Sequence, residues 1–265
     1  MLNGATFGSD PVYQAPAVRL KPPSKLLLLA EWRALFELGY GVASVPALML
    51  AKRGDGHPVL VLPGFLAGDP STDLLRRYLG WLGYETHGWE LGRNFGGVYS
   101  MRNKLRKRLT TIAEKSGRKV SIVGWSLGGI YARDLAHSLP ESVRYVVTLG
   151  SPFSSDITAT NASRLYEMLS GESVETMVPA DRALLCADLP VPTTSFYTRT
   201  DGVVNWKTCL VEEGPHAENV EVCASHVGLG VNPAVLWGVA DRLAQREGEF
   251  KRFDRLGPFA LTYPR

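Results

Sequence analysis

The sequence predicts an α/β protein in which a mostly parallel sheet is flanked by helices. The chain has 265 residues, of which 45% are hydrophobic and 21% are charged. This composition excludes a disordered tail, a disulfide-dense miniprotein and a collagen-like repeat. From residue 58 onward, short apolar runs alternate with stretches of helical periodicity, which is typical of a parallel sheet covered by helices.

The apolar runs are short and rich in Val, Ile and Leu, which favours strands that are buried on both faces. Strands are expected at residues 59–62, 84–87, 119–123, 144–149, 193–197 and 219–223. Apolar residues recur at helical spacing between and after these runs, so helices are expected at residues 73–82, 99–116, 127–138 and 233–246. Helices that stand between consecutive strands allow those strands to run parallel.

One domain with an excursion is expected to span residues 1–265. Residues 153–192 interrupt the alternation with helical pieces at 163–169 and 181–186, and a connection of this length usually has a function. Its apolar side chains either line a pocket or pack as a satellite core, and both alternatives fit a short helical cap over the site. They are Leu165, Tyr166, Met168, Leu169, Met177, Val178, Leu184 and Leu185.

An additional helical segment is expected before the first strand, at about residues 24–51. It contains four consecutive leucines, but Glu31, Arg33 and Glu37 interrupt it. Its longest uncharged part is shorter than the roughly 20 residues of a membrane-spanning helix. We therefore expect a helix that docks on the body of the protein and is kinked near Pro46. The alternative is peripheral contact with a membrane through this helix.

Charge and cysteine content exclude further classes of function. The net charge is +3, which is too small to indicate nucleic acid as the main partner. The basic run at residues 102–119 fits a solvated helix face, with lipid or polyanion contact as the alternative. The cysteines Cys186, Cys209 and Cys223 match no zinc pattern, so we expect no metal. Cys209 and Cys223 either form a disulfide or are plain buried thiols.

The N-terminal sequence has no evident secretory signal. Residues 1–23 lack a basic start that is followed by an apolar run and a small-residue cleavage site. A cytoplasmic location is therefore expected, with membrane association as the alternative.

The motif Gly-Trp-Ser-Leu-Gly at residues 124–128 lies between an expected strand and an expected helix. It is the G-x-S-x-G nucleophile elbow in the strand–turn–helix context that the motif requires. Glycines two positions on either side of Ser126 allow a strained turn to approach its neighbours. Ser126 is the predicted nucleophile, and the amide of Leu127 is a predicted oxyanion donor. The alternative is a glycine-rich turn whose serine only caps a helix.

A serine nucleophile needs a base, and the base needs an acid that orients it. His226 is the predicted base, because it directly follows the last expected strand among small residues; His216, in the polar loop before that strand, is the second candidate. Asp201 is the predicted acid, because it follows the strand at 193–197 and gives the chain order Ser, Asp, His. Asp156 is the rival acid. The other histidines, His57, His87 and His137, fit structural or surface positions.

The loop after the first strand is a candidate for the second oxyanion donor. Gly64 allows the chain to curl so that the amide of Phe65 faces the site. The alternative is an ordinary strand-to-helix turn. The side chains of Phe65 and Trp125 are predicted to contact the substrate, whereas Arg93 and Asn94 lie near the site without an assigned role.

Together these motifs resemble the α/β-hydrolase superfamily, and in particular its bacterial esterase- and lipase-like serine hydrolases. The resemblance covers residues 58 to about 245, through a Pro-Gly-Phe loop, a Thr-Asp-Gly turn and a Ser-His-x-Gly-Leu-Gly loop. It implies the α/β-hydrolase fold and hydrolysis of small-molecule carboxylic esters through an acyl-enzyme, with Ser126, Asp201 and His226 as the triad and no cofactor. Thioesterase, lactonase or acyltransferase activity uses the same triad, and a non-catalytic ligand-binding module is a further alternative. The usual opening hairpin is not evident before the first strand.

Overall fold

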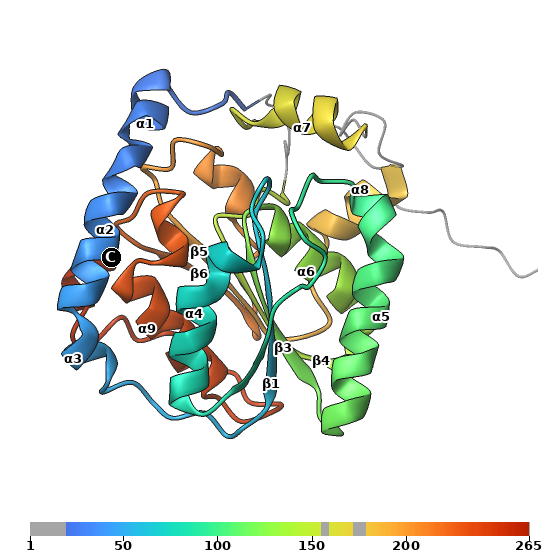
Figure 1. The fold of residues 1–265 in the computed structure, drawn as a ribbon, viewed down its shortest axis with the longest axis vertical. Helices are drawn as coiled ribbons and strands as arrows, with labels where there is room; N and C mark the ends of the chain where they lie inside the picture. The colour runs from blue at the N-terminus through green and yellow to red at the C-terminus, as the bar shows by residue number, and fades with distance from the viewer. Residues whose placement is uncertain (1–19, 155–158, 172–178, 265) are drawn as a thin grey trace, which may run out of the picture.

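Six parallel strands form a single sheet in the computed structural model, which describes residues 20–154, 159–171 and 179–264. The sheet order is β2-β1-β3-β4-β5-β6, and every neighbouring pair is parallel (Figure 1). The strands are β1 (Pro58–Leu62), β2 (Glu85–His87), β3 (Val120–Trp125), β4 (Val143–Leu149), β5 (Thr193–Tyr197) and β6 (Ala217–Glu221). No described strand precedes β1, so the N-terminal segment takes the place of an opening hairpin.

Helices cover both faces of the sheet, because successive side chains of a strand point to opposite faces. Val59 and Val61 of β1 pack with one pair of helices, whereas Leu60 and Leu62 pack with the other pair. The first pair is α4 (Asp69–Leu82) and α9 (Pro233–Leu243), and the second pair is α5 (Val98–Ser116) and α6 (Leu127–Ser138). The predicted α/β class and parallel sheet are thereby confirmed.

Several element boundaries differ from those expected. The helix expected from residue 73 begins at Asp69, because Pro70 occupies a first-turn position where its missing N–H costs no hydrogen bond. The last strand ends at Glu221 instead of residue 223. The amide of Cys223 donates a hydrogen bond to the carbonyl of Thr262, which is outside the sheet. The expected strand at 119–123 extends to Trp125, which still pairs with Leu149.

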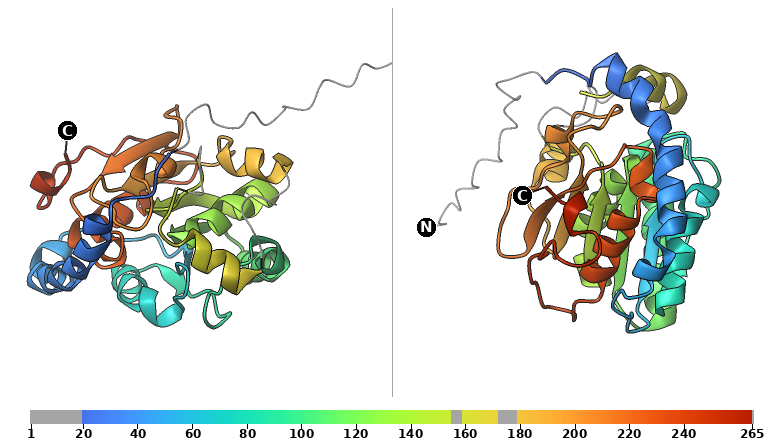
Figure 2. Two further views of the ribbon diagram at one scale, coloured as in Figure 1. Left: turned by 90° about the horizontal axis from the view of Figure 1, so that it is seen from above. Right: turned by 90° about the vertical axis from the view of Figure 1, so that its left-hand side faces the viewer.

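The N-terminal segment lies along the outside of the molecule beside α9 (Figure 2, right). It consists of α1 (Lys25–Leu29), a 3₁₀ turn (Ala30–Arg33), α2 (Ala34–Ala43) and α3 (Val45–Leu48). The break between α2 and α3 falls at Ser44, close to the expected kink at Pro46, which lies in the first turn of α3. None of the described helices combines the length and the apolar character needed to cross a membrane.

The predicted cap contains α7 (Ser163–Ser170) and α8 (Pro179–Cys186). Helix α7 lies above the carboxyl ends of the strands, whereas α8 packs against α6 (Figure 1). The apolar cap residues divide between the two expected roles: Tyr166 lines the pocket below α7, and Leu185 is buried in the core with α6. Met168 and Leu184 are exposed. Met177, Val178 and the side chains of Leu165 and Leu169 lie outside the described residues.

The three cysteines are free thiols. Cys209 is buried and Cys223 is exposed, so the disulfide that we considered between them is absent. Burial raises the pKa of the Cys209 thiol well above its usual range.

Candidate active site

Ser126 occupies a strained turn between β3 and α6. Its backbone angles are φ 53° and ψ −121°, a conformation that costs free energy and is common at functional sites. The two motif glycines are required by contact distances: a Cβ at Gly124 would lie 2.4 Å from the carbonyl oxygen of Gly128, and one at Gly128 would lie 2.3 Å from that of Leu62. The amide of Ser126 donates to the carbonyl of Leu149. The turn thus fixes the serine at the carboxyl end of a central strand.

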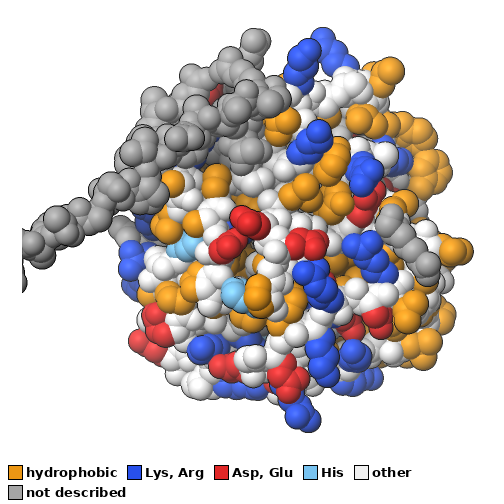
Figure 3. Space-filling model, turned by 180° about the vertical axis from the view of Figure 1, so that it is seen from behind, with side chains coloured by type: hydrophobic (Ala, Val, Ile, Leu, Met, Phe, Trp, Pro, Cys, Tyr) orange, Lys and Arg blue, Asp and Glu red, His pale blue; other side chains and the backbone are white. Residues whose placement is uncertain are grey.

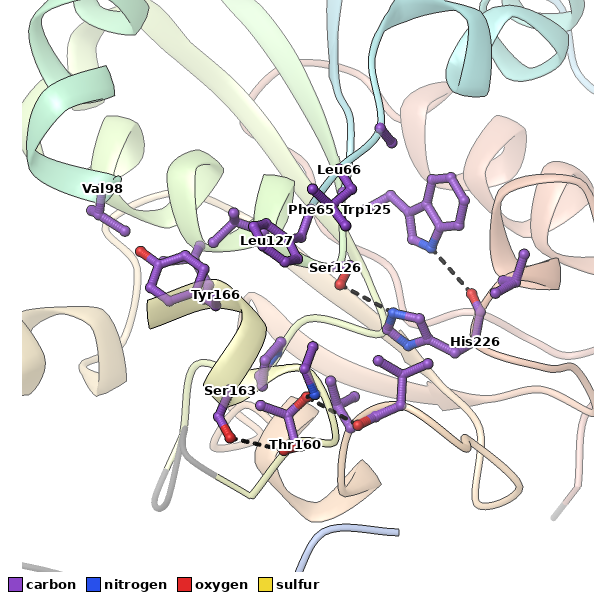
Figure 4. A pocket seen from close by; sticks show the side chains of 18 residues that line it. Phe65, Leu66, Val98, Trp125, Ser126, Leu127, Thr160, Ser163, Tyr166 and His226 are labelled. Carbon is purple, nitrogen blue, oxygen red and sulfur yellow. Dashed lines mark hydrogen bonds between the residues drawn. The ribbon is translucent and has the colours of Figure 1, made fainter. Parts of the chain in front are cut away.

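The structure brings the three predicted residues together in one chain of hydrogen bonds. Figure 4 shows the part of this chain that joins Ser126 to His226. Nε2 of His226 lies 3.0 Å from Oγ of Ser126, and Nδ1 lies 2.7 Å from Oδ2 of Asp201. Oδ1 of Asp201 accepts hydrogen bonds from the amides of Val203 and Val204, both at 2.8 Å. These amides hold the carboxylate in place while it faces the imidazole.

The surroundings of His226 favour its protonated form. Burial by itself lowers the pKa of the imidazole, but the charge and hydrogen bond of Asp201, together with the charge of Glu31, outweigh burial and raise the pKa above its ordinary value. A base with a raised pKa accepts the proton of a serine hydroxyl more readily.

The alternative site residues lie elsewhere. His216 faces the carbonyl of Leu189 at 3.3 Å, in a small hollow that is separate from Ser126. His57 is buried between Asp55 and Ser121, so it has the structural position expected of it. Asp156 lies outside the described residues.

The predicted oxyanion donors, Phe65 and Leu127, both line the pocket that contains Ser126. Leu127 is the first residue of α6, so its amide has no preceding turn to bond to. The Phe65 loop approaches the serine closely at Gly64, where a Cβ atom would lie 3.2 Å from Cβ of Ser126. This close approach is compatible with both amides facing one oxygen atom near Ser126.

Asn94 supports the Phe65 loop, and the sequence did not reveal this role. It is fully buried. Its backbone amide donates to the carbonyl of Ala67, and its backbone carbonyl accepts from the amide of Leu66, both at 2.7 Å. Its side chain donates to the carbonyl of Pro63 and accepts from the hydroxyl of Tyr131. Leu66 has a positive φ of 61°, so the loop is held in a conformation that few side chains favour. From the sequence, Asn94 was expected near the site without an assigned role.

An apolar pocket of about 320 Å³ opens above Ser126 (Figure 4). Phe65, Val98, Ile130 and Val204 supply apolar walls, and Tyr166 of the cap closes one side. Trp125, which was predicted to contact the substrate, lines the same pocket. Its indole N–H donates to the carbonyl of His226 at 3.1 Å, so this side chain also supports the histidine loop.

Comparisons with known proteins agree with this architecture. Lipase B of Aspergillus fumigatus superimposes with a TM-score of 0.58 at 16% identity, over 72% of this chain and 53% of the lipase. The match therefore spans about half of that lipase. A metagenome-derived lipolytic enzyme from the pair LipS and LipT superimposes with a TM-score of 0.53 at 14% identity, over 73% of this chain and 94% of that one. No protein-family model matches the chain, and the search of curated proteins gives no significant match.

The sheet order, the strained serine turn and these structural neighbours define the class: the chain has the α/β-hydrolase fold. Sequence identities this low establish the fold alone, so the activity is argued below from the residues of the site.

Proposed function

We propose that the protein is a serine hydrolase that cleaves carboxylic esters with apolar acyl groups. One observation carries the proposal: the Asp201–His226–Ser126 chain of hydrogen bonds ends in an apolar pocket that both Ser126 and His226 line. A hydroxyl, an imidazole and a carboxylate in this order are the parts needed to activate a serine nucleophile.

In the proposed reaction, Oγ of Ser126 attacks the ester carbonyl carbon while Nε2 of His226 takes the hydroxyl proton. The amides of Phe65 and Leu127 stabilise the negative charge on the former carbonyl oxygen. His226 then gives its proton to the departing alcohol, which leaves an acyl-enzyme on Ser126. Water attacks this ester by the same route, releases the acid and restores the serine. Asp201 stabilises the imidazolium in both steps.

The pocket supports an uncharged, apolar acyl group as the substrate. None of its described lining residues carries a full charge apart from the candidate base His226 when it is protonated. Its volume of about 320 Å³ lies at the lower end of the roughly 300–1,000 Å³ found for ligand pockets. We therefore expect esters with short and medium acyl chains to be cleaved faster than those with long chains.

A fluorophosphonate probe tests the nucleophile. We expect labelling of the wild type and none of Ser126→Ala, because the probe requires an activated serine. Absence of labelling in the folded wild type would exclude the proposed activity. A panel of p-nitrophenyl esters, an acyl thioester and a lactone then tests the substrate class, and a higher kcat/KM for the thioester or lactone would contradict ester preference.

We also propose a cytoplasmic location. The exposed free thiol of Cys223 supports it, because exposed thiols are commonly oxidised in secretory compartments. Fractionation of cells tests it, and recovery of the protein in the secreted fraction would contradict it.

A further inference from the structure

The N-terminal segment, residues 24–51, has an inverted distribution of polarity. Its charged residues Glu31, Arg33 and Glu37 turn toward the protein, where their side chains bond to the loops after β5 and β6. Most of its large apolar side chains turn toward solvent, although Leu48 is buried in the core. A helix on the surface of a globular protein normally has the opposite arrangement.

The outward side of this segment forms a continuous apolar face. Seven of its apolar side chains are between 62% and 78% exposed: Leu26, Leu29, Trp32, Leu35, Phe36, Val42 and Leu50. The face continues across a groove of about 330 Å³ to Leu74 and Trp81 of α4. In the view from behind, hydrophobic side chains gather along the right-hand edge, the side on which α1 to α3 lie (Figure 3). Single exposed apolar residues are ordinary, but a contiguous patch marks a contact surface.

Cations stand at both ends of the apolar face and beside the groove: Lys25 at one end, Lys52 and Arg53 at the other, and Arg77 at the groove. Lys52 is paired with Asp241 and Arg77 with Asp73, so among the described residues only Lys25 and Arg53 of these four have no carboxylate partner. Residues 24–51 present no exposed carboxylate, since Glu31 is buried and Glu37 is half-buried. In an antiparallel contact between two copies, Lys25 of each would approach Lys52 and Arg53 of the other. An anionic surface meets these cations without such repulsion.

We propose that this apolar face docks on a bilayer that contains anionic phospholipid. The segment would lie in the plane of the interface, with its apolar side chains among the acyl chains and its terminal cations at the headgroups. The carbonyl of Leu27 lies against Gly202, and Val203 and Val227 beside it line the pocket. The end of the segment that carries α1 therefore lies beside the pocket rim. This proposal goes beyond ester cleavage and does not depend on it.

Co-sedimentation with phospholipid vesicles tests the surface. We expect the full-length protein to pellet with vesicles of phosphatidylcholine and phosphatidylglycerol, and more weakly with phosphatidylcholine alone. In the double variant Leu29→Gln/Leu35→Gln, we expect the partition coefficient to fall at least about ten-fold, because two leucines no longer transfer from water to lipid. The matched control is Leu256→Gln/Leu261→Gln, which alters two exposed leucines elsewhere and should bind like the wild type.

Three results would overturn the docking proposal. The first is a wild type that does not pellet with either vesicle, and the second is a control that loses as much binding as the test variant. The third is a wild-type dimer, seen by sedimentation equilibrium without lipid, that dissociates in Leu29→Gln/Leu35→Gln and binds no vesicles, since the face would then join two copies. Ser126→Ala should bind as the wild type does, which separates docking from hydrolysis.

The inward side of the segment carries a second, independent inference. The Glu31 carboxylate is buried and accepts hydrogen bonds from the amides of Gly202 at 2.7 Å, His226 at 3.2 Å and Val227 at 2.9 Å. Gly202 follows Asp201, so a single carboxylate joins the loop of the acid to the loop of the base. Such a bridge fixes the distance between the two loops.

We infer that Glu31 is a positioning residue for His226; this inference rests on the proposed function. Asp201 faces the imidazole directly, and Glu31 faces the backbone of its loop. Arg33 also spans the two loops, through the carbonyls of Thr200 and Ala224. The negative charge of Glu31, like that of Asp201, raises the pKa of His226.

The variant Glu31→Gln tests this role, with Glu37→Gln as the matched control. Glu37 holds the same loop through the amide of Ser225 at 2.7 Å and the side chain of Asn232 at 2.8 Å. We expect Glu31→Gln to lower kcat by about 10- to 100-fold with little change in KM, because the base is misplaced. The acid limb of its kcat/KM profile should move to lower pH, since a negative charge near His226 is removed.

In Glu37→Gln the acid limb should stay where it is in the wild type. An unchanged kcat and profile in Glu31→Gln, or an equal shift in both variants, would overturn the positioning role. Fluorophosphonate labelling of the wild type is measured separately, so failure of this inference remains distinguishable from failure of the proposed hydrolase activity.

Discussion

The indole N–H of Trp125 donates a hydrogen bond to the carbonyl oxygen of His226 at 3.1 Å. Trp125 directly precedes the candidate nucleophile, and the two residues of the bond are 101 positions apart in the chain. The ring also packs against Gly230, where a Cβ would lie 3.4 Å from it. The serine turn and the histidine loop are therefore held together at a point next to the reacting atoms.

Substitution of Trp125 by Phe removes this hydrogen bond and keeps an aromatic ring. We expect kcat to fall by about 10-fold with a small change in KM, because the histidine loop loses a contact that fixes the base. Steady-state kinetics on a short p-nitrophenyl ester measures both constants. A large rise in KM with an unchanged kcat would instead assign Trp125 to substrate binding alone.

The acid of the triad is tested by Asp201→Asn beside Asp156→Asn. We expect Asp201→Asn to lower kcat by about 10³- to 10⁴-fold, because the imidazole loses the charge that orients it and stabilises its protonated form. Asp156→Asn should retain activity close to that of the wild type. If the two variants exchanged these results, Asp156 would be the acid.

The Phe65 loop depends on the buried side chain of Asn94. Its replacement by alanine leaves the carbonyl of Pro63 and the hydroxyl of Tyr131 without this partner. We expect kcat to fall by about 10²-fold, since the Phe65 amide would no longer be held toward the oxyanion. Circular dichroism serves as the folding control. Wild-type kcat in a folded Asn94→Ala would show that the loop needs no such support.

The dependence of activity on pH follows from the raised pKa of His226. The free enzyme needs a neutral imidazole, so kcat/KM should fall as the pH decreases through this pKa, which lies above the ordinary value of 6.5. A profile of kcat/KM from pH 5 to 9 on an uncharged ester measures it. A half-maximal point below pH 6.5 would contradict the assigned electrostatics.

Stability in acid should depend on His57, which lies in the protein interior. Burial, together with the charge of Arg144, lowers its pKa to about 4, although Asp55 acts in the opposite direction. Below pH 6.5 the unfolded chain binds a proton that the folded protein does not bind, so the free energy of unfolding falls between pH 6.5 and pH 4. The total loss from this group is about 3 kcal/mol.

Urea unfolding at pH 7 and pH 4.5 measures this loss. His57→Gln should be less stable than the wild type at pH 7, because the contacts to Asp55 and Ser121 are weakened. Its further loss on acidification should be smaller than that of the wild type. Parallel losses in the two proteins would mean that another group controls the acid response.

The positions of Ser126, Asp201 and His226 could be predicted because each follows a strand that the local sequence marks. Strands and the turns after them depend on residues close in the chain, and parallel strands place their carboxyl ends at one edge. The cap could be located because it interrupts the alternation of strands and helices. The sequence could not tell, however, that Tyr166 lines the pocket whereas Leu185 is buried in the core. Both are apolar residues on helices, and only packing decides which one meets the pocket.

The chain by itself therefore determined the α/β class, the order of strands and helices along it, and the candidate triad. Folding alone decided the inward turn of Glu31, the support that Asn94 gives to the Phe65 loop, and the bond between Trp125 and His226. Local periodicity counts Glu31 as an interruption of an apolar helix, whereas its partners lie 171 to 196 positions away. Contacts over such distances arise from the way the elements pack, and no local pattern encodes them.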